Sequence, residues 1–195
     1  INNRKKNSRN RNVTLNLVMT GMFSALLIVL SQLSIPTPTG VPITLQTLFV
    51  ILSGLILGPK LAALSQIIYV ILGLIGIPIF ANFTGGPQSV LKPSFGFLIG
   101  FIFAAFIVGK IANTGEKINK KRILAAAFAG TIVIYLFGLP YMAFILNKIM
   151  AKNLPTSVIL KTGCIIFLPG DALKTVISSL TAIKVLPKIN KVHSH

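Results

Sequence analysis

The chain has 195 residues, of which 53% are hydrophobic and only 11% charged, and its 19 Lys and Arg residues stand against 2 acidic ones. A water-soluble domain carries about 25% charged residues because its surface must stay solvated, so this composition excludes an ordinary soluble protein. The net charge of +17 lies in patches, separated by uncharged runs of 48 residues (12–59), 31 residues (61–91) and 25 residues (123–147). Because a bilayer crossing needs about 20 consecutive apolar residues, these runs predict a polytopic membrane protein and no nucleic-acid partner.

Prolines and glycines divide the apolar runs into helices. The segment 35–42, with three prolines and one glycine, predicts a turn between a first helix at about 13–34 and a second at about 43–58. Further helices are predicted at about 61–80, 94–111, 123–147 and 170–187, with a short or re-entrant helix within 153–168. The predicted fold class is therefore an all-α membrane protein of six transmembrane helices. One membrane domain, 13–187, lies between a basic tail, 1–12, and a C-terminal tail, 188–195.

The positive-inside rule orients these six crossings. With the N-terminus inside, 14 Lys and Arg residues fall at cytoplasmic ends and 4 fall outside, namely Lys92, Lys148, Lys152 and Lys161. Both termini are therefore expected to be cytoplasmic. The basic start is followed by an apolar run too long for a signal-peptide core, so no cleavable signal is expected.

Residue types that carry most enzyme chemistry are absent from the predicted helices. Cys164 is the only cysteine, and the only histidines, His193 and His195, lie in the C-terminal tail. Neither a disulfide, a metal site nor a His-assisted nucleophile is therefore expected. The sequence has no GxxxxGK[ST] phosphate loop, and one intramembrane carboxylate cannot form an aspartyl dyad. We therefore expect binding and translocation, with no catalysis and no cofactor.

Asp171 is the acidic residue at predicted membrane depth, whereas Glu116 lies in a basic loop and is expected to be a solvated surface charge. An ionisable group inside the membrane is costly and normally faces a partner or a polar cavity. Lys174 follows three residues later, on the same helical face, and Asp171 could also cap the first turn of its helix. Two interpretations stay open, a structural cap with an ion pair and a contact with a ligand.

Other polar and small residues interrupt the apolar segments. The segment 82–89 (NFTGGPQS) could bring backbone amides close to a ligand, and it could equally be an ordinary glycine-rich loop. Gln46 and Tyr69 could serve a ligand or pair with neighbouring helices. Gly21 and Ala25, four positions apart, form a small-xxx-small pattern that permits close helix approach, either within the domain or with a partner.

Several blocks together resemble the BioY family, the biotin-specific substrate-binding subunits of energy-coupling-factor transporters. They are VPITLQTL at 41–48, LGP at 57–59, YVILGLIGIPIF at 69–80, KPSFGF at 92–97 and LPGDALK at 168–174. The resemblance implies a six-helix, multi-pass protein of a prokaryotic cell membrane, which is not an enzyme and captures biotin from outside. It also implies two kinds of partner, a transmembrane coupling protein and a pair of ATPases, with ATP bound only by the ATPases.

The resemblance further implies roles for particular residues. Asp171 and Lys174 would line the pocket, together with Thr84 or its neighbour Asn82 from the loop after the third helix. Tyr141 stands where related sequences often carry tryptophan and could pack on the bicyclic ring of biotin. The small residues of the first helix, Gly21 and Ala25, would match the motif that docks on the coupling protein.

The block KPSFGF departs from the family's usual GPTGGY. A tyrosine hydroxyl is lost at Phe97, Lys92 replaces a glycine, and Leu98 stands where some relatives carry arginine. We hypothesise that Lys92 compensates as the cation for biotin's valerate carboxylate, with Lys174 as the alternative. The predicted binding residues are Gln46, Tyr69, Asn82, Thr84, Lys92, Tyr141, Asp171 and Lys174.

Two rival functions are compatible with the same residues. One is a substrate subunit for a different vitamin or for a biotin precursor such as dethiobiotin. The other is a small channel or proton-coupled carrier that uses Asp171 as its relay.

Overall fold

The structure, a computed structural model, describes residues 2–113 and 119–193, so that Glu116 lies outside the described ranges. The chain begins with α1 (Asn2–Gln32), which includes the basic residues expected to form a tail. The predicted turn at 35–42 joins two short strands, β1 (Ser34–Ile35) and β2 (Ile43–Thr44). They pair antiparallel, with Ser34 opposite Thr44 and Ile35 opposite Ile43.

α2 (Gln46–Leu74) consists of two helical arms that fold back on each other. The bend lies at Gly58, whose φ of +77° and ψ of 175° are not helical, and Pro59 follows it without an amide hydrogen. Gln66 Nε2 donates to Ser53 Oγ at 3.2 Å across 13 positions. In a straight helix these residues would lie about 20 Å apart, so the arms must be antiparallel. The break predicted at 58–60 is therefore the bend of this hairpin.

The second arm ends at Leu74, earlier than the predicted end at about residue 80. Gly76 has a φ of +112°, and Pro78 follows, so the helix does not continue. The chain instead forms two short turns of 3₁₀ helix, η1 (Ala81–Phe83) and η2 (Pro87–Leu91), before the next long helix.

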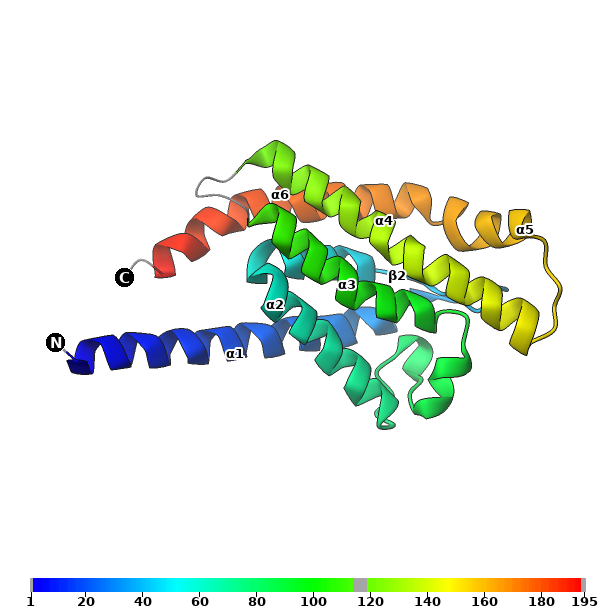
Figure 1. Ribbon diagram of the computed structural model, residues 1–195, viewed down its shortest axis with the longest axis horizontal. Helices are drawn as coiled ribbons and strands as arrows, with labels where there is room; N and C mark the ends of the chain where they lie inside the picture. Colours follow the sequence, from blue (N-terminus) through cyan, green and yellow to red (C-terminus); the bar gives the residue numbers. More distant parts are fainter. Residues whose placement is uncertain (1, 114–118, 194–195) are drawn as a thin grey trace.

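The remaining elements are helical. They are α3 (Phe95–Ala112), α4 (Lys120–Phe144), the π-helical turn η3 (Ile145–Ile149), α5 (Thr156–Leu160), a second π-helical turn η4 (Lys161–Ile165) and α6 (Leu168–His193). The short helix expected within 153–168 corresponds to α5 and η4. Both lead into α6 along one line, so the re-entrant alternative is not what the structure shows (Figure 1).

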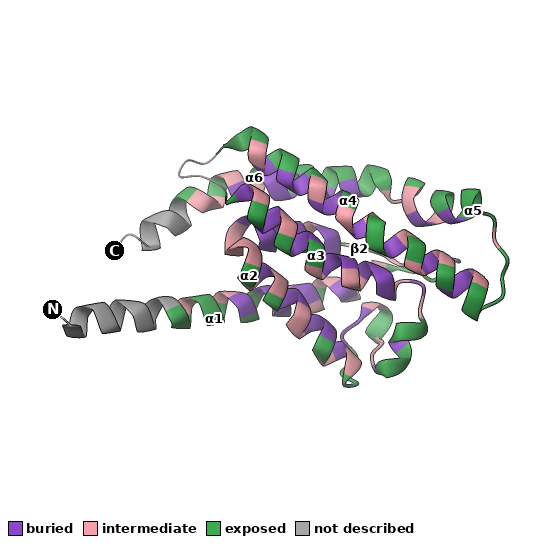
Figure 2. Ribbon diagram, in the orientation of Figure 1, coloured by how far each residue is buried: buried purple, intermediate pink, exposed green. Residues whose placement is uncertain are grey.

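Five helices are long and apolar enough to cross a membrane, and α2 counts once among them although it turns back. They are Val13–Gln32, Gln46–Leu74, Phe95–Ala112, Lys120–Ile149 and Thr156–Pro187. Buried residues face the middle of the bundle and exposed ones face outward (Figure 2). Outward side chains such as Leu17, 70% exposed, and Leu136, 65% exposed, are apolar. A surface of this kind is suited to lipid rather than to water.

The bend of α2 makes a tight contact with α3, which gives a test of the packing. A Cβ added at Gly109 would lie 2.5 Å from the Pro59 nitrogen and 2.6 Å from the Gly58 carbonyl carbon. Backbone atoms cannot give way as a flexible side chain can, so Gly109→Ala should be destabilising by about 1–3 kcal/mol. We expect the thermal unfolding midpoint in detergent to fall by roughly 2 to 10 °C.

Gly21→Ala is the matched control, because no atom lies within 4 Å of a Cβ at Gly21. Alanine has the higher helix propensity, so this variant should unfold at the wild-type temperature or slightly above it. An unchanged midpoint for Gly109→Ala would show that the α2 bend and α3 separate easily.

Candidate ligand pocket

A cavity of about 890 Å³, including its open mouth, lies among α2, α3, α4 and α6 and is bordered by the segments 40–44 and 80–92. Six of the eight predicted binding residues line it, namely Gln46, Asn82, Thr84, Lys92, Asp171 and Lys174. The other two, Tyr69 and Tyr141, lie outside its lining.

Asp171 and Lys174 form the predicted ion pair on the first turns of α6. Lys174 Nζ lies 2.9 Å from Asp171 Oδ1 and donates to the Thr44 carbonyl oxygen at 2.6 Å. The second carboxylate oxygen accepts from Tyr135 Oη at 2.5 Å. Among the described residues no backbone amide donates to this carboxylate, because α6 already begins at Leu168. The expected ion pair is confirmed, whereas the expected helix cap is not found.

Tyr69 acts on the cavity indirectly, through Gln46. Its ring is fully buried, and its hydroxyl accepts from Gln46 Nε2 at 2.9 Å and donates to the Ile79 carbonyl oxygen at 3.3 Å. Thr44 Oγ1 donates to Gln46 Oε1 at 3.1 Å from the other side. These two bonds hold Gln46 in one orientation. Because Gln46 and Tyr69 lie on different arms of α2, the bond between them also joins the two arms.

Thr84 and Asn82 reach the cavity from the loop between α2 and α3. Phe80 and Thr84 exchange backbone hydrogen bonds of 2.8 and 3.2 Å, and Thr84 Oγ1 donates to the Ala81 carbonyl oxygen. Asn82 has a φ of +59°, and its Oδ1 accepts from Ser34 Oγ at 2.9 Å. Asparagine tolerates this left-handed conformation better than most residues. The loop is therefore tied to itself and to the β1 strand.

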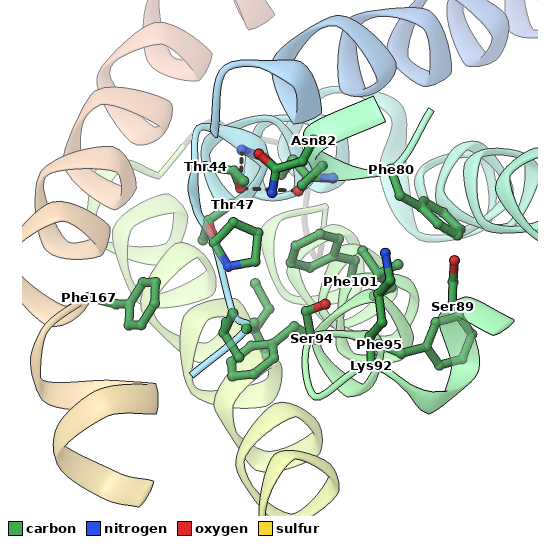
Figure 3. A pocket seen from close by; sticks show the side chains of 18 of the residues that line it. Thr44, Thr47, Phe80, Asn82, Ser89, Lys92, Ser94, Phe95, Phe101 and Phe167 are labelled. Atoms are coloured by element: carbon green, nitrogen blue, oxygen red, sulfur yellow. Dashed lines mark hydrogen bonds between the residues drawn. The ribbon is translucent and has the colours of Figure 1, made fainter. Parts of the chain in front are cut away.

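Lys92, Ser89 and Ser94 line the cavity from the segment that leads into α3 (Figure 3). Ser89 is 2% exposed, and its hydroxyl has no hydrogen-bond partner. The Lys92 ammonium and the Ser94 hydroxyl likewise make no hydrogen bond or ion pair with any residue that the structure describes. Burial lowers the pKa of Lys92 from its ordinary value, because desolvation disfavours the charged form.

Aromatic side chains form the apolar part of the wall, on several sides of the cavity (Figure 3). They are Phe80, Phe95, Phe97, Phe101, Tyr135 and Phe167. Phe97, where the sequence shows a lost hydroxyl, packs edge-on against Tyr135, with ring centroids 6.3 Å apart and planes at 85°. Of these two rings, only Tyr135 carries a hydroxyl.

Apart from Phe97, the sequence did not single out Tyr135 or the phenylalanines of this wall. Phenylalanine is common in apolar helices, so its pattern carries no signal. The sequence does carry a signal for Tyr135. Its hydroxyl lies inside an apolar helix and needs a hydrogen-bond acceptor, and Asp171 is the acceptor expected at the same depth.

Tyr141 supports the wall from outside the cavity. Its hydroxyl donates to the Val90 carbonyl oxygen at 2.5 Å, and its ring centroid lies 6.1 Å from that of Phe95. Gly96 lies beside it, so close that a Cβ there would be 2.2 Å from the Tyr141 Cβ. The structure thus places Tyr141 where it fixes the segment before α3, rather than where it could stack on a ligand.

Gly21 and Ala25 lie on an exposed face of α1. No atom lies within 4 Å of a Cβ built on Gly21, and the neighbouring Val18 and Met22 are 59% and 46% exposed. The sequence left open whether these small residues pack within the domain or against a partner. Within the described chain nothing packs where the Gly21 side chain would lie, and Ala25 is exposed.

A second cavity lies between α4 and α6. It is lined by the outward-facing Phe128, Ile132 and Leu168, and it shares Tyr135 and Asp171 with the first cavity. The hydrogen bond between Tyr135 and Asp171 is therefore part of the partition between the pocket and the outer surface of the bundle.

The pocket is suited to a small ligand that combines hydrogen-bonding groups, an apolar part and one negative charge. Its charged groups are Asp171, Lys174 and Lys92, which sum to one positive charge. The described residues hold no group of three or more His, Cys, Asp or Glu that could bind a metal ion. Pre-formed hydrogen-bonding groups between aromatic walls are typical of sites that bind small molecules tightly.

Comparison with known proteins identifies one family. The model of the BioY family matches residues 3–191. The chain is 38% identical to a probable biotin transporter BioY of Lysinibacillus sphaericus, over 87% of this chain and 85% of that one. It is 37% identical to the biotin transporter BioY of Thermotoga maritima, over 86% and 94%. The structure matches a crystal structure of the S-component for biotin from an ECF-type ABC transporter with a TM-score of 0.70 and 28% identity, covering 91% and 94%.

Proposed function

Because the chain belongs to the BioY family, we propose that it is the substrate-binding subunit of a vitamin importer that captures biotin from outside the cell. One observation carries the proposal. The pocket holds a buried carboxylate and ammonium pair at α6 and an ammonium without a counter-charge, among the described residues, near α3. Biotin has a polar bicyclic ring and a single carboxylate, so its chemistry matches both parts of the pocket.

The ureido ring of biotin offers one carbonyl acceptor and two N–H donors. Each oxygen of Asp171 already accepts one hydrogen bond, from Lys174 or Tyr135, and a carboxylate oxygen can accept a second. The ammonium of Lys174 uses two of its three donors on protein oxygens. The remaining acceptor and donor capacity can therefore serve the ureido group, while the phenylalanines cover the apolar part of the ring system.

The proposed topology places six crossings in the cell membrane of a prokaryote, with both termini inside. The two antiparallel arms of α2 account for two of them, and the other four long helices for one each. The start of α1 and the end of α6 lie at the same end of the molecule, as an even number of crossings requires (Figure 1). Fourteen basic residues at the inner side agree with the positive-inside rule.

The proposed partners are a transmembrane coupling protein and a pair of ATPases, which would deliver biotin inward with the energy of ATP. The exposed small residues of α1, Gly21 and Ala25, would let a helix of the coupling protein approach closely. ATP would bind to the partner subunits alone.

Isothermal titration of the purified full chain with biotin, dethiobiotin and an unrelated vitamin such as riboflavin tests the substrate. We expect biotin to bind most tightly, and we expect it to be found by mass spectrometry in protein purified from biotin-containing medium. Tighter binding of dethiobiotin or riboflavin would reassign the substrate.

Uptake of labelled biotin by cells that express the chain with its coupling module tests the transport mechanism. We expect uptake to stop when the ATPases carry an inactivating substitution. Uptake that persists then, but collapses with the proton gradient, would instead support a proton-coupled carrier.

A further inference from the structure

We propose that Gln32, the last residue of α1, is a positioning residue of the pocket. It fixes the loop 79–84 in the conformation in which this loop lines the cavity, and it thereby slows the release of a bound ligand. Gln32 does not line the cavity itself, so it acts through the loop. The part of the inference that concerns release rests on the proposed function, because it takes biotin as the ligand.

The side-chain amide of Gln32 pairs with the loop backbone through both its nitrogen and its oxygen. Gln32 Nε2 donates to the Ile79 carbonyl oxygen at 3.0 Å and to that of Phe80 at 3.3 Å. Gln32 Oε1 accepts from the Phe83 amide at 3.0 Å. Because these groups are backbone groups, the bonds fix the course of the loop itself and not merely one of its side chains.

The Ile79 carbonyl oxygen connects this contact to the pocket. Besides the Gln32 bond, it accepts from Ser31 Oγ at 2.6 Å and from Tyr69 Oη at 3.3 Å. Tyr69 in turn accepts from Gln46, which lines the cavity. The end of α1, the second arm of α2 and the loop therefore meet at one oxygen, so a shift of the loop would break bonds to both helices.

The loop needs such a restraint because its backbone is strained. Asn82 and Phe83 have φ values of +59° and +54°, which place two successive non-glycine residues in the left-handed region. This conformation is unfavourable and persists only where surrounding contacts determine it. The Phe83 side chain is 72% exposed, so packing does not hold it. Two bonds from outside the loop do, that of Gln32 to the Phe83 amide and that of Ser34 Oγ to Asn82 Oδ1 at 2.9 Å.

The strained loop supplies one side of the cavity wall, where Figure 3 shows Phe80 and Asn82. A wall that is ordered before the ligand arrives does not have to be ordered during binding, which favours affinity. Among variants of one site, differences in affinity appear mostly in the dissociation rate. Gln32 should therefore slow release more than it speeds capture.

Release of labelled biotin from the purified full-length protein into an excess of unlabelled biotin tests the inference. Gln32→Met keeps the length of the side chain and removes its hydrogen bonds. We expect this variant to release biotin about tenfold faster than wild type, which corresponds to about 1.4 kcal/mol, the order of one or two net hydrogen bonds. Its association rate should stay within about twofold of wild type. Gln32→Glu, which keeps an acceptor for the Phe83 amide but loses the donor, should release biotin at an intermediate rate.

Gln88→Met is the matched control, because it makes the same substitution a few residues along the chain. Gln88 is exposed, does not line the cavity and donates to the Gly85 carbonyl oxygen at 2.6 Å, within its own segment. This variant should release biotin at the wild-type rate.

Amide hydrogen exchange at Phe83 in the ligand-free protein gives a reading that does not depend on the substrate. Exchange should be faster in Gln32→Met than in wild type, because the amide loses its acceptor, and unchanged in Gln88→Met.

A residue that served the fold alone would lower the unfolding temperature and leave the release rate of the folded protein unchanged. The inference is overturned if Gln32→Met releases biotin at the wild-type rate, or if the exchange of the Phe83 amide does not change. A folded wild-type protein that binds no biotin would contradict the proposed function, while faster exchange in Gln32→Met would still support the positioning of the loop. The two failures are thereby separated.

Discussion

Asp171→Asn is expected to bind biotin more than tenfold more weakly than the wild-type protein. The carboxylate is buried, and its two oxygens accept from Lys174 and Tyr135. An amide keeps the shape but replaces one acceptor oxygen by a donor, and it leaves the Lys174 ammonium without a counter-charge. Removing one partner of a buried, hydrogen-bonded charge pair costs roughly 2–5 kcal/mol. Isothermal titration of the purified variant measures the effect directly.

The double variant Asp171→Asn with Lys174→Met separates binding from folding. Removing both charges relieves the unpaired ammonium, so the unfolding temperature should recover toward that of the wild type. Biotin affinity should stay low, because the acceptors for the ureido group are still missing. If both variants bound biotin with wild-type affinity, Asp171 would be a structural residue only.

Replacing Gly21 and Ala25 together by leucine should abolish assembly with the coupling protein and leave biotin affinity within about twofold of wild type. Both residues are exposed on α1, and nothing in the described chain packs on Gly21. Leucine side chains would hold a partner helix away from the α1 backbone, while the pocket lies among other helices. Co-purification with the coupling protein and the ATPases measures assembly, and titration with biotin measures the affinity of the pocket.

Ala125→Leu is the control for bulk at a membrane-facing position, since Ala125 is an exposed small residue of α4. It should assemble normally. Loss of biotin binding in the Gly21 and Ala25 variant would mean that these residues serve the fold, and normal assembly would place the docking surface elsewhere.

The sequence predicted well those features that depend on neighbouring residues. Proline and glycine marked the turn at 35–42 and the bend at Gly58 and Pro59, because both residues restrict the backbone locally. Spacing of three residues in a helix was enough to pair Asp171 with Lys174. The helix that starts at Leu168 shows the limit of this method, since a start two residues earlier than expected removes Asp171 from the capping position.

The features that were missed depend on contacts between distant parts of the chain. Tyr135 meets Asp171 across 36 positions, and Lys174 meets the Thr44 carbonyl oxygen across 130. No local pattern indicates such pairs in a single sequence. Tyr69 illustrates the opposite case. The sequence placed it among the predicted binding residues because it is polar. In the structure it is buried behind Gln46 and holds the Gln46 side chain, which lines the pocket.

The partition formed by Tyr135 and Asp171 has an electrostatic consequence. On one side of this hydrogen bond lies the pocket, and on the other lies a groove lined by the outward-facing Phe128, Ile132 and Leu168. Hydrocarbon on that side cannot screen charge, because its dielectric constant is low. Field lines from the ion pair are therefore focused into the cavity rather than dissipated outward. A ligand dipole entering from water would meet a field that the bilayer itself helps to concentrate.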